Sequence, residues 1–214
     1  MPPENLQNLT WVLLCLINVK YVSGNPLIHL HQLRSQFSNR SMTQVPSQTQ
    51  TLPLRWKPSV TVAAIVEKAG RYLLIEEHTP EGLKLNNPAG HLDPGESLAE
   101  ACARECLEET AHPLQVTSLV GIYQSRFQRE AKNGHAAEDI TYLRFAFTGE
   151  LGPAIEGQAL DEGILRVIWL SLEEVRASVS QHRSPLVLQC IEDHARGQRL
   201  ALNAIHTDAS VWRA

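Results

Sequence analysis

The sequence contains few cysteines and no excess of positive charge, and each absence excludes a class of protein. The four cysteines, at positions 15, 102, 106 and 190, form no C-x-x-C pair, so the sequence predicts neither a zinc site nor a disulfide framework. We expect reduced cysteines that serve as small apolar packing residues, as in a cytoplasmic protein. A formal net charge of −4 argues against binding to nucleic acid, because neutralising phosphates requires clustered lysine and arginine.

The beginning of the chain also lacks a membrane-spanning segment. The apolar stretch at residues 9–19 is interrupted by Thr10 and Asn18 and is too short to cross a bilayer. A secretory signal peptide is the alternative interpretation. However, residues 1–8 contain Glu4 and no lysine or arginine, so the positive segment that begins such a peptide is missing. We therefore expect no membrane partner.

The first 55 residues differ in composition from the rest of the chain. Residues 41–51 are rich in serine, threonine and glutamine, which is typical of a flexible linker or tail. Met42 is the only methionine after Met1, which suggests that translation begins there. We expect residues 1–55 to be an extension that is disordered or, for residues 1–41, absent from the native protein. The intact mass of the native protein tests this, since an N-terminus at Met1 would exclude the second possibility.

Residues 56–206 have the pattern of one α/β domain of the α+β type, and residues 207–214 form a tail. The 43% of hydrophobic and 20% of charged residues are typical of a globular domain. Residues 60–66 and 72–75 flank the turn residues Ala69-Gly70, which predicts a pair of antiparallel strands. Further strands are expected at residues 116–124, 140–147 and 165–170, with a loop or irregular strand at 85–91 and a long polar loop, suspected of a function, at 126–139.

Capping signals predict three helices. A helix at roughly residues 97–110 begins with Ser97, and Glu100 three residues later completes a capping box, while Pro113 stops it. The same signals predict two more helices, one capped by Ser171 and Glu174 and one bounded by Ser184, Pro185 and Gly197.

The first of these helices carries a cluster of carboxylates. On a helical wheel, Glu105, Glu108 and Glu109 fall within about 100° of one another. Three such carboxylates repel, and a hard divalent cation such as Mg²⁺ or Mn²⁺ removes the repulsion because it prefers oxygen ligands. Arg104 precedes Glu108 by four residues and is placed to orient it. A solvated acidic face without a ligand is the alternative.

We expect the opposite side of the helix to pack on the sheet through Ala99, Ala103, Cys106, Leu107 and Thr110, with Leu98, Ala101 and Cys102 on the acidic side.

The spacing around this cluster is much more specific than three glutamates alone. From Gly90 the chain runs G-x(5)-E-x(7)-R-E-x-x-E-E, with the fixed places held by Gly90, Glu96, Arg104, Glu105, Glu108 and Glu109. This resembles the Nudix box, G-x(5)-E-x(7)-R-E-U-x-E-E-x-G-U, where U is bulky and aliphatic. Three places depart from it. Cys106 and His112 stand where the box has an aliphatic residue, and Ala111 stands where it has a glycine. Alanine at position 111 should lower the stability of the folded protein by about 1 kcal/mol, because the glycine of the box at this place normally ends the helix in a left-handed conformation. We expect His112 to meet free carbonyls at the helix end.

Short segments outside the box resemble one group of bacterial Nudix phosphatases. These segments are residues 58–63, 88–91, 143–145, 184–187 and 197–199, so the resemblance covers roughly residues 57–205. It implies the Nudix fold, a mixed sheet sandwiched between helices, and a magnesium-dependent hydrolase of phosphoanhydride bonds. The substrates implied are nucleoside di- and triphosphates and the hydroxymethylpyrimidine pyrophosphate that is a precursor of thiamine.

The resemblance also implies roles for individual residues. Glu105, Glu108 and Glu109 would be metal ligands and Arg104 would orient a carboxylate. Glu96 would support the geometry of the loop and helix, and Gly90 would let the backbone approach the metal or the phosphate. The general base has two alternatives, a glutamate of the box or an acid of a loop, either Asp161 or Glu162. Arg126 and Arg144 are candidates to bind phosphates, and Tyr123, Phe127 and Trp169 either stack on a ring or belong to the core.

Two other functions are alternatives to this hydrolase. One is a Nudix pyrophosphatase for a dinucleotide such as ADP-ribose or NADH. The other is a non-catalytic Nudix domain that senses a nucleotide, but such domains commonly lose box carboxylates, and all four glutamates and the arginine are present here. We therefore expect an enzyme with a small-molecule phosphoanhydride substrate, which acts as a monomer or a homodimer.

Overall fold

Strand β1 (Ser59–Ala64) lies at the centre of the domain, and both of its faces are buried. The structure is a computed structural model that describes residues 55–131 and 136–213, so the expected N-terminal extension lies outside the described residues apart from Arg55. Ala63 faces one hydrophobic cluster and Val62 and Ala64 face another. This double burial explains why the segment is a continuous apolar run instead of an alternating one.

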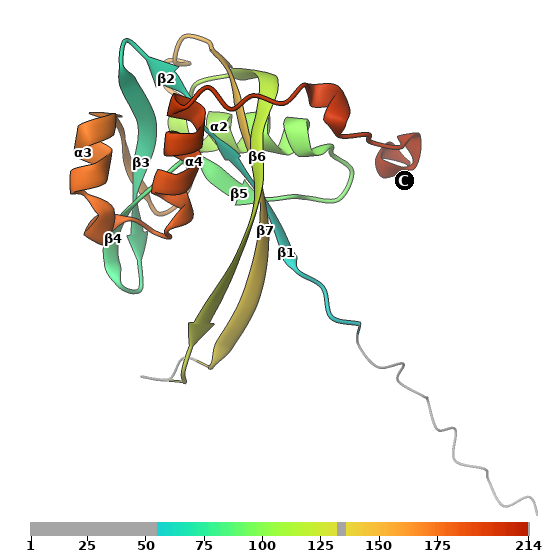
Figure 1. Cartoon of the computed structure of the whole chain (residues 1–214), viewed down its shortest axis with the longest axis horizontal. Coiled ribbons are helices and arrows are strands. Elements are labelled where there is room, and N and C mark those ends of the chain that lie inside the picture. Colours follow the sequence, from blue (N-terminus) through green and yellow to red (C-terminus); the bar gives the residue numbers. More distant parts are fainter. Residues whose placement is uncertain (1–54, 132–135, 214) are drawn as a thin grey trace, which may run out of the picture. The chain divides into compact units, whose positions relative to one another are not determined.

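The strands form two four-stranded sheets, and β1 belongs to the first of them (Figure 1). The first has the order β5-β1-β7-β6 and is mixed, since β1 and β7 are parallel and the other pairs are antiparallel. Its other strands are β5 (Ala89–His91), β6 (Leu114–Arg129) and β7 (Glu138–Leu151). The second sheet is antiparallel and consists of β2 (Glu67–Lys68), β3 (Arg71–Thr79), β4 (Gly82–Asn86) and β8 (Ile164–Ser171), with β8 on the other edge of β3.

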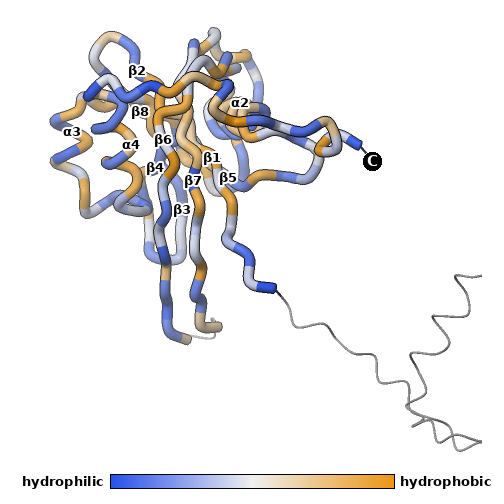
Figure 2. The backbone as a smooth tube through the Cα atoms, turned by 45° about the vertical axis from the view of Figure 1, so that its right-hand side comes forward, coloured by the Kyte–Doolittle hydropathy of each residue, from blue (hydrophilic) through white to orange (hydrophobic). Residues whose placement is uncertain are grey.

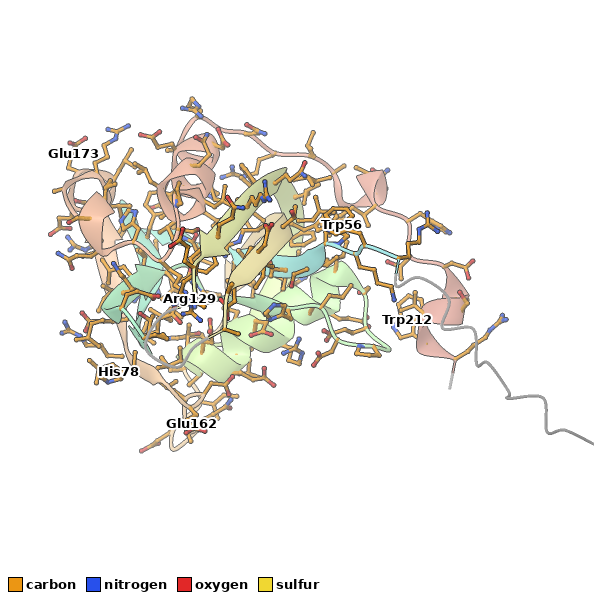
Figure 3. The ribbon with its side chains drawn as sticks, turned by 90° about the horizontal axis from the view of Figure 1, so that it is seen from below. Trp56, His78, Arg129, Glu162, Glu173 and Trp212 are labelled. Atoms are coloured by element: carbon orange, nitrogen blue, oxygen red, sulfur yellow. The ribbon has the colours of Figure 1, made fainter. Side chains whose placement is uncertain are left out.

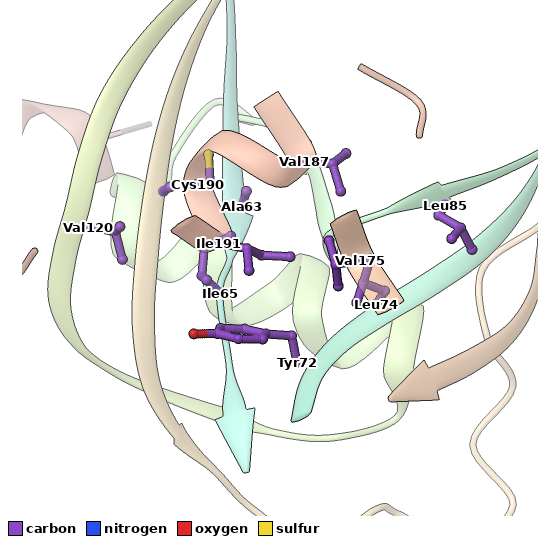
Figure 4. Packing of buried hydrophobic residues seen from close by; sticks show 11 residues of the cluster. Ala63, Ile65, Tyr72, Leu74, Leu85, Val120, Val175, Val187, Cys190 and Ile191 are labelled. Atoms are coloured by element: carbon purple, nitrogen blue, oxygen red, sulfur yellow. The ribbon is translucent and has the colours of Figure 1, made fainter. Parts of the chain in front are cut away.

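Helices cover both sides of the core. Helix α2 (Leu98–Thr110) packs on one side through Ala101, Cys102 and Cys106. Helices α3 (Leu172–Ala177) and α4 (Leu186–Ala195) cover the other side, where Val175, Val187 and Ile191 meet the sheets (Figure 4). The predicted class, a mixed sheet between helices, is confirmed, and the structure divides it into two sheets. None of the helices in the described ranges combines the length and apolar character that crossing a bilayer requires.

Short 3-10 turns complete the domain. They are η1 (Val179–Gln181), η2 (Leu202–Ala204) and η3 (Ala209–Trp212). The last lies in the expected tail, and there the indole N–H of Trp212 donates to a carboxylate oxygen of Glu100 at 3.1 Å. The end of the described chain therefore contacts the first turn of α2.

The predicted capping of the helices is largely correct. Ser97 with Glu100 and Ser171 with Glu174 form complete capping boxes, and Gly197 follows α4 with a φ of 82°. Ser184 is an exception, because its hydroxyl has no hydrogen-bond partner among the described residues and Pro185 occupies the cap position.

Two predictions about strands are correct only in part. The Ala69-Gly70 turn joins an antiparallel pair, β2 and β3, and the carbonyl of Val66 accepts from the N–H of Leu73 at 2.9 Å, but β1 itself joins the other sheet. The predicted loop at 126–139 is shorter than expected, because residues 126–129 belong to β6 and residues 138–139 to β7. The charged side chains of these strand ends pair across the hairpin, Arg126 with Asp139 and Arg129 with Glu138. Hydrophilic residues predominate at the far end of β6, which extends beyond the core (Figures 1 and 2).

Candidate active site

Helix α2 buries Cys106 and Thr110 as predicted, but not Ala99, Ala103 or Leu107, so its buried face is rotated from the predicted one. Its buried residues are Ala101, Cys102, Glu105, Cys106, Glu109 and Thr110. The row 101–105–109 therefore runs beside the row 102–106–110, and the acidic residues border the packing surface directly. The prediction that Ala101 and Cys102 lie on the acidic side, away from the sheet, is wrong, because both are buried in the core. The carboxylate of Glu109 accepts from the backbone N–H of Ala89 on β5, and that of Glu105 accepts from Arg104 of the same helix.

Strand β5 provides the space for the first of these glutamates. Gly90 is the Cα partner of Val62, whose side chain faces α2, so Gly90 lies on the same face of the sheet. A Cβ atom at position 90 would collide with the carboxylate of Glu105. The group that approaches the backbone of Gly90 is thus a carboxylate of the protein, and the predicted contact with metal or phosphate stays a prediction.

Arg104 joins three carboxylates of the helix and the loop before it. Its Nε and Nη2 donate to the two oxygens of Glu96 at 3.0 and 2.8 Å. Its Nη1 donates to Glu105 at 2.8 Å and to Glu108 at 2.9 Å. A further bond from Nη2 to the carbonyl of His91, at 2.9 Å, ties the end of β5 to the helix. Arg104 therefore fixes the positions of these carboxylates relative to one another.

Glu109 has no cationic partner among the described residues. Its Oε2 accepts from the backbone N–H of Ala89 at 2.7 Å, and the residue is 8% exposed. Burial raises the pKa of the Glu109 carboxyl to about 8, and the negative charges of Glu105, Glu77 and Asp161 act in the same direction. Burial also raises the pKa of Glu105, although Arg104 opposes this. The acidic cluster, which is Glu96, Glu105, Glu108 and Glu109, thus carries more negative charge than Arg104 neutralises.

The chemistry of the acidic cluster suits a hard divalent cation. Carboxylate oxygens are the ligands that Mg²⁺ and Mn²⁺ prefer, and a cation would relieve the repulsion that raises the pKa of Glu109. Within the described residues, however, no three acidic, histidine or cysteine side chains are already arranged to hold a metal ion. Arg104 holds Glu105 and Glu108 with its own N–H groups, so a cation would have to take over carboxylate oxygens from Arg104.

A cavity of about 480 Å³ adjoins the acidic cluster. Its floor is the face of the first sheet opposite α2, where Thr61, Arg144 and Tyr142 lie on neighbouring strands. The second sheet and the segment before α4 supply other walls, including Glu77, Asn86 and Arg183. Because Ala89 and Gly90 also line the cavity, the backbone of β5 touches both the cavity and the carboxylates of Glu109 and Glu105.

Four arginines line this cavity, and three of them already have acidic partners. Arg126 pairs with Asp139 at 2.6 Å, Arg129 with Glu138 at 3.0 Å, and Arg183 lies 3.8 Å from Glu81. Arg144 makes no ion pair with the described residues, although it is only 9% exposed. Its Nε and Nη1 lack hydrogen-bond partners there, and burial lowers the pKa of its guanidinium. Arg144 is therefore the cavity arginine that has no acidic partner among the described residues.

A family model described as the NUDIX domain matches residues 55–190, which is more than half of the chain. The chain belongs to the Nudix family. Phosphatase NudJ of Escherichia coli (strain K12) is 37% identical over 150 residues, which cover 70% of this chain and 92% of that protein. The resemblance that the short flanking segments indicated is thereby confirmed, and the chain is a Nudix hydrolase.

Solved structures agree with this assignment. A NUDIX hydrolase from Nitrosomonas europaea has 47% sequence identity and a TM-score of 0.63, and the match covers 71% of this chain and 98% of that one. A MutT NUDIX hydrolase from Burkholderia pseudomallei shares the fold at 20% identity, with a TM-score of 0.50 and coverage of 64% and 98%. Nudix hydrolases typically use a divalent metal, which is consistent with the chemistry of the acidic cluster.

Of the three departures from the Nudix box, Cys106 lies within α2 and Ala111 and His112 follow its last residue. Cys106 is fully buried in the core, as expected for a small apolar residue. Ala111 occupies the left-handed conformation that glycine normally supplies, with a φ of 58°. His112 does not meet a carbonyl of the helix end, because its Nδ1 lies 2.8 Å from the carbonyl oxygen of Gly152, which follows β7. The prediction for His112 is therefore wrong about its partner.

The two loop acids differ in position. Asp161 donates its backbone N–H to the carbonyl of Glu108 at 3.0 Å, and its charge raises the pKa of Glu105 and Glu109. Glu162 is exposed at the periphery of the domain (Figure 3) and does not line the cavity. The structure therefore brings Asp161, and not Glu162, close to the acidic cluster.

Of the predicted aromatic residues, Phe127 alone lines the cavity. Trp169 packs against the core, and the hydroxyl of Tyr123 donates to Asp193 at 2.9 Å. The sequence provided no expectation for other residues that line the cavity, among them Thr61, Glu77, Asn86, Tyr142 and Arg183. Glu77 and Asn86 belong to the hairpin of β3 and β4, and the others come from separate parts of the chain, so their only signal in the sequence is polar or aromatic character within or beside apolar strands.

Proposed function

We propose that this Nudix hydrolase is a cytoplasmic, Mg²⁺- or Mn²⁺-dependent enzyme that removes phosphate from nucleoside di- and triphosphates and from hydroxymethylpyrimidine pyrophosphate. The observation that supports this most is the position of the acidic cluster beside a cavity that holds a buried arginine, Arg144, which has no acidic partner in the described part of the chain. The volume of about 480 Å³ lies within the range of cavities that bind small ligands. The identity to phosphatase NudJ supports a phosphatase, and the free buried cysteines suit a reducing compartment.

The residues of the acidic cluster would have distinct roles. Glu105, Glu108 and Glu109 would hold the cation, and Arg104 with Glu96 would orient them. When bound, the cation would neutralise phosphate oxygens and activate a water molecule for attack on phosphorus.

The other residues would act on the substrate and on the proton of the attacking water. Gly90, Arg126 and Arg144 would contact the substrate from the cavity, where all three are lining residues. A box glutamate, Asp161 or Glu162 would accept the proton, and the position of Asp161 beside Glu108 favours it between the two loop acids.

A panel of phosphorylated metabolites, assayed with and without Mg²⁺, tests this function. We expect release of single phosphates from nucleoside triphosphates and from the pyrimidine pyrophosphate, and only with the cation. Cleavage of ADP-ribose or NADH to two monophosphates would favour the dinucleotide pyrophosphatase instead. Nucleotide binding with no turnover on any substrate would favour a sensing domain.

A further inference from the structure

The walls of the cavity contain several buried polar atoms without partners. Among the described residues, Thr61 Oγ1, Asn86 Oδ1 and both Nε and Nη1 of Arg144 accept or donate no hydrogen bond. All three residues line the cavity, and each is at least nine-tenths buried, at 6%, 7% and 9% exposed. Ser184 Oγ and Arg129 Nε are further unpartnered atoms of the same lining. Buried polar groups are normally hydrogen-bonded, so this concentration indicates a ligand that supplies the missing partners.

The hydrogen bond of the Asn86 side chain determines which of its amide atoms lacks a partner. Its Nδ2 donates to Oε1 of Glu77 at 3.1 Å, and an ionised carboxylate can only accept. The amide nitrogen must therefore face Glu77, which leaves Oδ1 without a partner. An acceptor, Asn86 Oδ1, and donors, the N–H groups of Arg144, consequently line one cavity.

This combination does not suit a phosphate group. Phosphate oxygens only accept hydrogen bonds at neutral pH, so they would satisfy Arg144 but would leave Asn86 Oδ1 unpaired. They would also meet the negative charge of Glu77, which lines the cavity and acts on Arg144. A ring edge with an exocyclic amine and a ring nitrogen has one donor and one acceptor side by side, which matches both groups. Phe127 and Tyr142 line the same cavity and offer aromatic faces for stacking.

We propose that Asn86, Arg144 and Thr61 form a base subsite that selects substrates whose ring carries an exocyclic amine over those that carry an oxo group. Asn86 Oδ1 accepts from the amine, an N–H of Arg144 donates to the adjacent ring nitrogen, and the Thr61 hydroxyl serves either partner. The subsite rests on the proposed function, since the phosphates of the same substrate must lie at the acidic cluster. A ring with an oxo group turns an acceptor toward Asn86 Oδ1, and its adjacent ring nitrogen carries a proton and turns an N–H toward Arg144, so its binding loses both hydrogen bonds.

The test compares substrates that differ in the base alone. We expect kcat/KM with Mg²⁺ to be about tenfold or more higher for CTP than for UTP, and for ATP than for ITP, because each pair exchanges the amine for an oxo group. Equal values within both pairs would overturn the subsite and leave the proposed function standing. If none of the four is hydrolysed, the proposed function fails. Calorimetric binding of CTP and UTP then still decides, since tighter binding of CTP supports the subsite and equal binding overturns it.

Variants assign the selectivity to residues. Asn86→Leu should bring the ratio of CTP to UTP close to 1, because the acceptor is removed. Gln124→Leu, which removes an exposed side-chain amide outside the cavity, should keep the wild-type ratio. Arg144→Lys should lower the ratio as well, since lysine does not reproduce the position of the guanidinium N–H groups. A loss that is equal for all four nucleotides in Arg144→Lys, with an unchanged ratio in Asn86→Leu, would assign these residues to phosphate binding or structure and overturn the proposal.

Discussion

The acidic cluster and the cavity beside it differ in how their polar groups are satisfied. In the cluster, Arg104 donates to Glu96, Glu105 and Glu108, and Ala89 donates to Glu109, so each carboxylate has a partner while the charges do not balance. In the cavity, the charges of three arginines are balanced by acidic partners, yet several buried polar atoms have no hydrogen-bond partner among the described residues. The first region is incomplete without a positive charge, and the second without hydrogen bonds. This difference separates a region for cation chemistry from a region for recognition.

The largest effect is expected when one negative charge is removed from the acidic cluster. Glu109→Gln keeps the size of the side chain and an oxygen for the Ala89 N–H, but removes a negative charge near the cation. We expect kcat to fall on the order of 100-fold or more. Because burial already raises the pKa of Glu109 to about 8, losing the charge should leave the melting temperature unchanged or higher. Phosphate release and thermal unfolding measure the two effects.

Glu150→Gln is the matched control, since Glu150 is exposed on β7. It should leave both turnover and melting temperature as in the wild type. Equal magnesium-dependent turnover in Glu109→Gln and in the wild type would contradict the assignment of Glu109 as a ligand.

The next largest effect concerns the close approach of the Glu105 carboxylate to Gly90 on β5, the strand that borders both the acidic cluster and the cavity. Gly90→Ala should destabilise the protein by about 1–3 kcal/mol, because the added Cβ collides with the Glu105 carboxylate. Chemical denaturation of Gly90→Ala, Glu105→Ala and the double variant measures the coupling. We expect the penalty of Gly90→Ala to shrink strongly when Glu105 is already alanine. A penalty that is the same in both backgrounds would mean that the carboxylate is not what excludes a side chain here.

The smallest effect concerns the end of α2. Ala111→Gly should stabilise the protein by about 1 kcal/mol, because Ala111 has a φ of 58° and glycine adopts that conformation without strain. Turnover should not change, since Ala111 contacts neither the acidic cluster nor the cavity lining. A lower melting temperature in this variant would show that the methyl group of Ala111, which is 8% exposed, contributes more through packing than it costs in strain.

The sequence predicted the acidic cluster far better than the cavity. Local signals were sufficient for α2, because capping by Ser97 and Glu100 and the spacing from Gly90 to Glu109 depend on neighbours in the chain. The buried face of α2 was predicted only in part, for Cys106 and Thr110, since it depends on which side of the helix meets β5. The pairing of β1 with β7, across about eighty residues of chain, likewise has no local signal.

The cavity shows the same limit more clearly. Thr61, Asn86 and Arg144 come from three strands, and only the sheet register and the packing of the two sheets bring them to one space. Arg144 is a candidate from the sequence because it is a cation between apolar neighbours, whereas Asn86 resembles a turn residue before Pro88. Residues 126–129 and 138–139 have the composition of a loop because their polar side chains pair with each other across the hairpin and need no core.

The most direct test of the acidic cluster is a titration with Mn²⁺, followed by electron paramagnetic resonance in the absence of substrate. The wild type should bind the ion, and Glu105→Gln and Glu109→Gln should each bind it at least about tenfold more weakly, while Glu150→Gln binds as the wild type does. Equal Mn²⁺ affinity in all four proteins would contradict the claim that these buried carboxylates hold the catalytic cation.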